Sequence, residues 1–332
     1  MKLSAYLSTC LLGITSTLAV VLSSSIASAL TPEEIDAVAS QTTVVIGNGL
    51  AKGQIESGED ARGFNTGSGV IIGREDNIYY VLTALHVVNG KNQDYRIRTW
   101  DGEVYPARDR HTKKPNILKL GSFKIGQPIK GLDLAIIKFQ SNKEYHIASV
   151  KSSEYLKPED ALFASGWPEP EDDSAYRVRV FKDGLLSLIA SEPSLDGGYS
   201  LLYTNETSTG MSGGPVFDQD GWVVGIHAQG RANVSAGKYC IDPQVSINNS
   251  CGIQTIHFLT TVEAEELRNR TSLNQEPVDP STIADGIENK ERADVIENIY
   301  EDFTVDFVES GIRSYPSGTC WSLLLGDNFC NQ

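Results

Sequence analysis

Positive charge is scarce in this sequence. Its 332 residues include 28 Lys and Arg against 43 Asp and Glu, which gives a formal net charge of −15 at pH 7. Proteins that bind nucleic acid or anionic lipid surfaces through phosphates need an excess of basic residues. We therefore expect neither a nucleic acid nor a membrane surface among the partners of the mature chain.

Apolar runs long enough to span a membrane are also missing. The N-terminus combines a positive Lys2, an apolar run over 11–22 and an A-S-A triplet at 27–29. These are the three parts of a secretory signal peptide, and the run is too short and too rich in Ser and Thr for a comfortable membrane span. We expect a signal peptide at 1–29 and a secreted or periplasmic mature protein. A lipoprotein signal at Cys10 is the weaker alternative, because little apolar sequence precedes that cysteine.

Metal-binding spacings are absent as well. The four cysteines after the signal are Cys240, Cys251, Cys320 and Cys330, and neither a C-x-x-C nor an H-E-x-x-H spacing occurs. A zinc site is therefore disfavoured. An even number of cysteines in an exported chain indicates disulfides, and proximity favours Cys240–Cys251 and Cys320–Cys330. Two other connectivities remain open.

The region 42–260 is dominated by short β-rich runs. Examples are 78–83, 134–139 and 222–227, separated by stretches rich in Gly, Asp, Asn and Pro. This regular spacing of short strands and turns, without helical periodicity between them, favours an antiparallel all-β barrel or sandwich. The length suffices for two barrels, with a boundary near residue 150. A short helix is expected afterwards, over 261–268.

The last part of the chain differs in composition. Residues 271–332 contain twelve Asp and Glu against three Lys and Arg, and 274–282 reads as a linker. We predict an amphipathic helix beyond the linker that packs on the barrels, with a partner-binding helix as the alternative. Its apolar face would consist of Ile296, Ile299, Tyr300, Phe303 and Phe307.

Three motifs carry candidate chemistry, in the order His, Asp, Ser. His86 follows Thr-Ala at the end of an apolar run, Asp133 opens another apolar run, and Ser212 lies in the turn G-M-S-G-G-P at 210–215. A serine hydroxyl becomes a nucleophile only with a base to take its proton and N–H donors to hold the oxyanion. Each motif alone has an ordinary structural interpretation, but their joint occurrence in this order favours nucleophilic catalysis.

At these motifs the chain resembles the trypsin/chymotrypsin-like serine peptidases, over roughly 42–267. The family's T-A-A-H is T-A-L-H here, D-[IL]-A-L is D-L-A-I, and G-D-S-G-G-P is G-M-S-G-G-P. The resemblance implies Ser212 as nucleophile, His86 as general base and acid, and Asp133 as the group that orients the imidazole. The N–H groups of Gly210 and Ser212 would form the oxyanion hole.

The fold implied by the resemblance is all-β, with two antiparallel six-stranded β-barrels of the chymotrypsin type. A peptidase domain at 30–270 would hold barrels at about 42–150 and 151–260. An acidic, helical and disulfide-stapled extension would follow at 271–332. The implied activity is that of a secreted serine endopeptidase that cleaves proteins or peptides through an acyl-enzyme. We expect it to work as a monomer, without a metal or an organic cofactor.

Met211 departs from the animal members of the family. They carry an aspartate there, which pairs with a freshly cut N-terminus during activation, and a methionine cannot form that ion pair. The chain also lacks a basic cleavage site followed by an I-V-G-G-like start. We therefore place it nearer the bacterial branch and expect no such activation switch.

The substrate pocket implied by the resemblance is lined by 205–209 and 225–230. His227 and Thr207 resemble the glutamate-specific bacterial branch, in which a histidine and a hydroxyl bind a substrate carboxylate. Glu206 matches the position of the aspartate that selects basic residues, so cleavage after Lys or Arg stays open. Cleavage after small or apolar residues stays open too, as does a purely structural role for His227.

Two other function classes deserve comparison. A catalytically silent barrel that binds a partner is the alternative to the enzyme. An α/β-hydrolase is disfavoured, because its acid and histidine follow the serine, whereas His86 and Asp133 precede Ser212 here. An autoinhibitory role for the acidic 271–332 segment is a further hypothesis.

Overall fold

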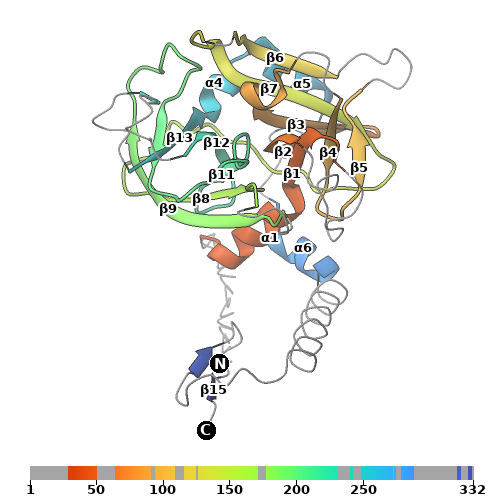
Figure 1. Cartoon of the computed structure of the whole chain (residues 1–332), viewed down its shortest axis with the longest axis vertical. Helices are drawn as coiled ribbons and strands as arrows, with labels where there is room; N and C mark the ends of the chain where they lie inside the picture. Colours follow the sequence, from red (N-terminus) through yellow and green to blue (C-terminus); the bar gives the residue numbers. More distant parts are fainter. Residues whose placement is uncertain are drawn as a thin grey trace, which may run out of the picture.

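The structure is a computed structural model and consists mainly of two antiparallel β-sheets packed side by side (Figure 1). The residues it describes are 29–50, 64–90, 94–108, 116–124, 126–170, 177–230, 240–241, 248–271, 273, 278–287, 320–322 and 328–330.

The first sheet has seven strands in the order β5-β4-β1-β2-β3-β7-β6. The resemblance implies six strands, and the additional strand is the three-residue β5 at one edge, paired to β4. The described strands form a half-barrel whose edges are β5 and β6. The bounds are β1 (Thr43–Asn48), β2 (Phe64–Glu75), β3 (Ile78–Ala84), β4 (Tyr95–Arg98), β5 (Val104–Pro106), β6 (Ile117–Ser122) and β7 (Lys130–Gln140).

The second sheet closes into a six-stranded barrel in the order β10-β13-β12-β11-β8-β9, which confirms the implied barrel in this half. The hairpin between β11 and β12 is fixed by Asp218, whose carboxylate accepts from the N–H groups of Asp220 and Trp222 at 2.9 Å each. The bounds are β8 (Ala161–Gly166), β9 (Val180–Ile189), β10 (Leu201–Tyr203), β11 (Pro215–Phe217), β12 (Val223–Gln229) and β13 (Ser250–Gln254).

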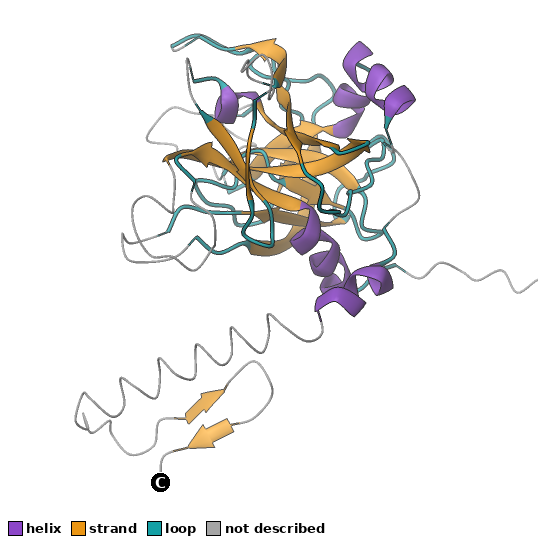
Figure 2. Cartoon of the chain, turned by 90° about the vertical axis from the view of Figure 1, so that its right-hand side faces the viewer, coloured by secondary structure: helices purple, strands orange, loops and turns teal. Residues whose placement is uncertain are grey.

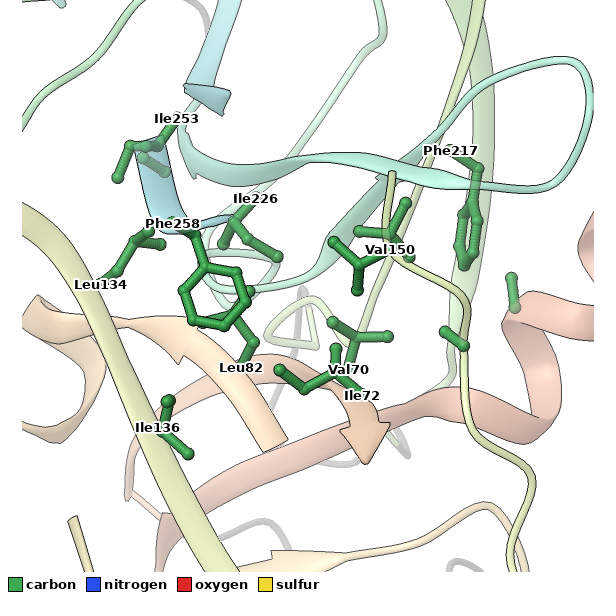
Figure 3. Close-up of a cluster of buried hydrophobic side chains, with 14 of the residues drawn as sticks. Val70, Ile72, Leu82, Leu134, Ile136, Val150, Phe217, Ile226, Ile253 and Phe258 are labelled. Carbon is green, nitrogen blue, oxygen red and sulfur yellow. The ribbon is translucent and has the colours of Figure 1, made fainter. Parts of the chain in front are cut away.

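Alternation along the strands sorts the side chains into separate cores. Val81 belongs to the core of the first half, whereas its neighbour Leu82 packs in a core shared by both halves. In the second half, Leu201 lines the barrel and Leu202 joins the shared core. Successive strand residues face opposite sides of a sheet, so each sheet fills its own interior and also one side of the seam. Figure 3 shows this seam, with Leu82 and Ile136 from the first sheet and Ile226 and Ile253 from the second.

Short helices lie at two opposite ends of the sheets (Figures 1 and 2). They are α1 (Pro32–Thr42), α4 (Thr255–Leu259), α5 (Val262–Arg270) and α6 (Pro280–Ile287). The short helix predicted over 261–268 corresponds to α5. Helix α1 begins at a capping box, in which Thr31 and Glu34 satisfy each other's backbone N–H groups. No helix among these is long and apolar enough to cross a membrane.

Helix α6 corrects one prediction. The predicted linker runs to residue 282, but the helix already begins at Pro280. Proline is well tolerated at the first helical position, because its missing N–H would have no partner there. Helix α6 packs against α1, and Ile283, 1% exposed, shares a core with Ile35. The helix predicted over 296–307 and residues 1–28 of the signal peptide predicted over 1–29 lie outside the described residues.

One disulfide joins Cys240 to Cys251, at the first residues of β13. Near the C-terminus, β14 (Cys320–Ser322) and β15 (Asn328–Cys330) form an antiparallel pair in which Cys320 stands opposite Cys330. The side chains of this pair lie outside the described residues, so the second disulfide stays a prediction.

Candidate active site

His86 lies in a tight turn directly after β3. The turn, η1 (Leu85–Val88), is a 3₁₀ helix in which Leu85, Val87 and Val88 are buried. The His86 side chain is 29% exposed. The apolar residues therefore anchor the turn and leave the imidazole at the surface of the seam.

Asp133 lies near the beginning of β7, beside the strand that delivers His86. Its carboxylate is fully buried and accepts two hydrogen bonds from His86: Oδ1 from the backbone N–H at 2.8 Å and Oδ2 from ring Nδ1 at 2.7 Å. A carboxylate only accepts, so the imidazole proton sits on Nδ1 and Nε2 keeps its lone pair. The pair therefore presents a base at Nε2.

The turn that carries Ser212 is packed against the first sheet. Gly213 has φ +87°, and a Cβ there would lie 2.2 Å from both Ser68 O and Thr83 Oγ1. The N–H of Ser68 donates to Ser212 O at 2.7 Å. The turn that carries Ser212, in the second half, thus sits directly on the strand end that leads to His86.

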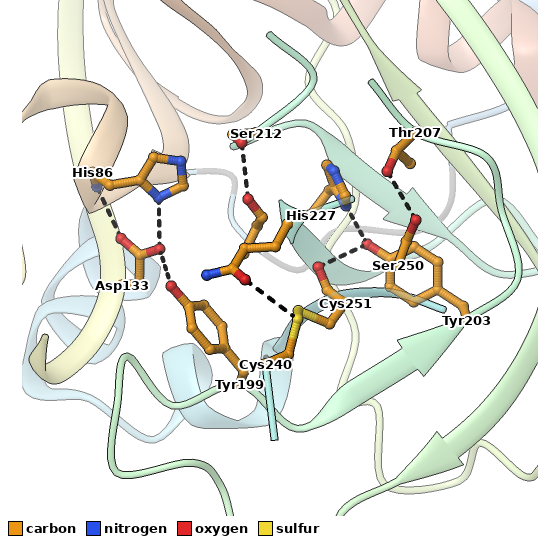
Figure 4. The surroundings of a disulfide bond; sticks show 12 residues. His86, Asp133, Tyr199, Tyr203, Thr207, Ser212, His227, Cys240, Ser250 and Cys251 are labelled. Carbon is orange, nitrogen blue, oxygen red and sulfur yellow. Dashed lines mark hydrogen bonds and ion pairs between the residues drawn. A yellow bond between two sulfur atoms is a disulfide. The ribbon is translucent and has the colours of Figure 1, made fainter. Parts of the chain in front are cut away.

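The hydroxyl of Ser212 is directed to a backbone carbonyl. Within the described residues, Ser212 Oγ donates to Ala228 O at 2.8 Å, and no bond from it to His86 is formed (Figure 4). Serine side chains occupy three staggered rotamers, so rotation about Cα–Cβ is the movement that would redirect the hydroxyl. Unliganded enzymes often lack the catalytic hydrogen bond that forms with substrate.

The backbone before Ser212 is held in one orientation. Thr209 O accepts from the N–H of Glu169 at 2.8 Å. A trans peptide points its C=O and N–H in opposite directions, so the N–H of Gly210 faces away from Glu169. Gly210 has φ +95°, and a Cβ there would lie 2.8 Å from Glu169 N and from Trp167 O. Only glycine fits this position.

Met211 is an apolar core residue. It is 1% exposed and lies against Gly166, where a Cβ would come within 2.9 Å of Met211 Cβ. Packing therefore fills the place in which other members of the resembled family hold an ion pair.

The two predicted pocket residues lie on opposite sides of β13. Thr207 Oγ1 is 2.8 Å from Ser250 Oγ, and His227 Nδ1 is 2.6 Å from the Tyr203 hydroxyl (Figure 4). His227 is 1% exposed. Burial first, and the nearby His86 second, lower the pKa of His227 to about 3, so this imidazole is neutral at pH 7. Glu206 lies exposed at the surface.

Several side chains around this site carry no sequence motif. Tyr199 donates to Asp133, Tyr203 contacts His227, and Ser68 Oγ donates to Gly210 O at 2.9 Å. Only the Gly197-Gly198 doublet beside Tyr199 signals a turn, and nothing in the sequence says where that turn docks.

Comparison with known proteins identifies the domain. Residues 67–226 match the family described as trypsin-like peptidase domain. A glutamyl endopeptidase of Staphylococcus epidermidis is 29% identical over 178 residues, which cover 52% of this chain and 56% of the relative. A glutamyl endopeptidase of Staphylococcus aureus (strain MW2) is 26% identical over 201 residues, which cover 58% of this chain and 55% of the relative. The chain thus spans about half the length of these curated relatives. Residues 67–226 thus match a trypsin-like peptidase domain, and the chain is similar to the bacterial glutamyl endopeptidases.

Proposed function

We propose that the protein is a serine endopeptidase whose catalytic triad is Ser212, His86 and Asp133. The observation that carries the proposal is the buried Asp133 carboxylate, which holds Nδ1 of His86 at 2.7 Å beside the turn of Ser212. That arrangement leaves Nε2 as a proton acceptor, and rotation of the Ser212 side chain would bring its hydroxyl to this base, as nucleophilic catalysis requires.

In the reaction, His86 Nε2 takes the proton of Ser212 Oγ while Oγ attacks the substrate carbonyl. The imidazolium then gives its proton to the leaving amine, and an acyl-enzyme remains. The same nitrogen removes a proton from water, which attacks the ester, and the imidazolium returns this proton to Ser212 Oγ as the second product leaves. Asp133 keeps its charge and stabilises the imidazolium throughout.

The oxyanion is held by the N–H groups of Gly210 and Ser212. The bond from Glu169 to Thr209 O supports this role, because it turns the Gly210 N–H to the side away from Glu169. A donor fixed before the reaction needs no reorganisation when charge develops on the oxygen.

The preferred substrate residue before the scissile bond is Glu or Asp. The Tyr203 hydroxyl lies 2.6 Å from His227 Nδ1 and donates to Cys251 O at 3.3 Å, so it holds the ring in place. In the tautomer that carries its proton on Nε2, the neutral imidazole donates to a carboxylate. Thr207 supplies a hydroxyl from the segment that precedes Ser212. The names of the staphylococcal relatives favour the same preference.

The protein is exported and acts on proteins or peptides outside the cytoplasm. The signal-like 1–29 segment supports export, with 30–270 as the peptidase domain and 271–332 as the acidic extension.

A catalytically silent binding module is the second candidate. The observation that favours it is the bond from Ser212 Oγ to Ala228 O, which directs the hydroxyl away from the base. A fluorophosphonate probe separates the two candidates, because it reacts only with an activated serine. We expect labelling of the folded mature protein and none of Ser212→Ala. Absence of labelling and of peptide hydrolysis in the wild type would support the silent module.

Substrate preference is tested with a peptide library that varies the residue before the cleaved bond. We expect cleavage after Glu or Asp and a selective loss in His227→Ala, with kcat/KM falling far more for acidic than for neutral substrates. Tyr203→Phe should show the same selectivity to a smaller degree, because it removes the hydroxyl that hydrogen-bonds Nδ1 of His227. A strict preference for Lys or Arg would contradict this assignment.

A further inference from the structure

The Asp133 carboxylate receives a third hydrogen bond that the triad alone does not explain. Besides its two bonds from His86, Oδ2 accepts from the Tyr199 hydroxyl at 2.8 Å. Asp133 is fully buried and Tyr199 is 2% exposed. A buried carboxylate needs such donors, because it has lost its water.

Tyr199 comes from the opposite half of the molecule and is fastened to Asp133 through the backbone. It follows a turn between β9 and β10 of the second barrel, whereas Asp133 belongs to the first sheet. The N–H of Asp133 donates to Gly197 O at 2.8 Å, and the N–H of Gly197 donates to Ile129 O at 3.0 Å. Asp196 Oδ1 accepts from the N–H of Ile129 at 2.6 Å. The turn is thus locked onto the chain segment that carries the carboxylate.

The approach of this turn is close enough to require glycine. Gly197 has φ +78°, and a Cβ there would lie 3.0 Å from Asp133 Cβ. Gly198 has φ +77°, and a Cβ there would lie 2.7 Å from Leu132 Cδ2. Two adjacent glycines therefore let the turn reach Asp133 and set the phenol against its carboxylate.

The hydroxyl acts as a donor in this position. Burial raises the pKa of Tyr199, and the neighbouring Asp133 charge raises it further, so the phenol keeps its proton. The Gln229 side chain lies close enough to the same phenol to act on its pKa in the opposite direction. Gln229 directly follows Ala228, whose carbonyl holds the Ser212 hydroxyl. Tyr199 therefore lies between the carboxylate and the strand that holds the Ser212 hydroxyl.

We infer that Tyr199 is a positioning residue of the triad, which acts through Asp133. The inference rests on the proposed function. Oδ2 has two lone pairs, and His86 Nδ1 and the Tyr199 hydroxyl occupy both of them. The carboxylate cannot rotate without breaking charge-assisted bonds on both sides, so Oδ2 stays aligned with the imidazole.

The test is Tyr199→Phe, which removes a single oxygen and keeps the ring. We expect kcat to fall about 10- to 100-fold, the range expected when a hydrogen bond to a charged group is lost, while KM changes less than about twofold. The acid limb of the pH profile of kcat/KM should move to higher pH. Once the Tyr199 donor is removed, less of the carboxylate's negative charge is neutralised by hydrogen bonds. The carboxylate then stabilises the protonated imidazole more strongly.

The matched control is Tyr79→Phe. Tyr79 is fully buried and its hydroxyl donates to Lys143 O at 3.1 Å, away from the triad residues. It should keep wild-type kcat and pH profile even if its melting temperature falls. Wild-type kcat and an unmoved acid limb in Tyr199→Phe would overturn the inference and leave Tyr199 with a structural role only.

A measurement that needs no turnover separates this inference from the proposed function. In a Ser212→Ala background, NMR titration of the His86 imidazole should show its midpoint at higher pH when Tyr199→Phe is added. Failure of the proposed function shows instead as a wild type that neither hydrolyses peptides nor reacts with a fluorophosphonate. If Tyr199→Phe does not fold, Gln229→Met should give a smaller shift in the same direction, and no shift would overturn the inference.

Discussion

The buried His227 should make the protein sensitive to acid. Burial lowers the pKa of this histidine from its ordinary 6.5 to about 3, so the folded state holds it neutral where the unfolded chain already binds a proton. Stability is therefore lost as the pH falls through the window between 6.5 and 3. The integrated linkage from pH 7 to pH 4 is about 3 kcal/mol for this one group, as an order of magnitude.

The assay is urea unfolding of the wild type and of His227→Gln at pH 7 and pH 4. Other groups also titrate in this range, so the quantity of interest is the difference between the two proteins. We expect the variant to lose about 3 kcal/mol less than the wild type over this pH interval. His146→Gln is the control, because His146 is only half-buried and its pKa is lowered less deeply. Equal losses in the wild type and His227→Gln would refute the reasoning.

Three further predictions concern stability. Gly213→Ala places a Cβ 2.2 Å from Ser68 O and Thr83 Oγ1 at a positive φ, so we expect the free energy of unfolding to fall by about 2–5 kcal/mol and activity to be lost. Gly126→Ala is the control: a Cβ there has no atom within 4 Å, so stability should fall only by the strain of the positive φ. Reduction of Cys240–Cys251, eleven positions apart, should lower stability by about 3 kcal/mol in thermal melts, and a Cys240→Ser variant should no longer respond to reductant in this way. Ile283→Ala should increase amide hydrogen exchange in α1 and α6, whereas Val262→Ala, at a 67% exposed site, should not. Unchanged protection at 280–287 would contradict the packing of α6 on α1.

The sequence predicts the β architecture because short apolar runs are separated by turn residues. Residues such as Val81 and Leu82 read as a continuous apolar run, which is typical of a strand buried on both faces, and the structure places them in two different cores. The meeting of His86 and Asp133 could be expected from the motifs, since the family resemblance ties these two positions together. The edge strand β5 could not, because three residues give no period to detect.

Other parts depend on long-range contacts that no local pattern records. Helix α6 is stabilised by Ile283 against the N-terminal helix α1, a distant contact, so its first residues, 280–282, read as part of a linker. Tyr199 lies among ordinary turn residues, and its role follows only from where the second barrel meets Asp133. The rotamer of Ser212 likewise depends on the position of Ala228 O on the neighbouring strand β12.

The packing of α6 on α1 has a consequence for how the chain matures. These helices come from opposite ends of the described sequence, and contacts so far apart along a chain form late, because a large loop must close first. During synthesis α6 emerges after both sheets have been made, so α1, which also contacts β8 and β9, receives its last packing partner late. A leader over the proposed 1–29 segment would thus be joined to a helix whose packing is completed only after both sheets exist.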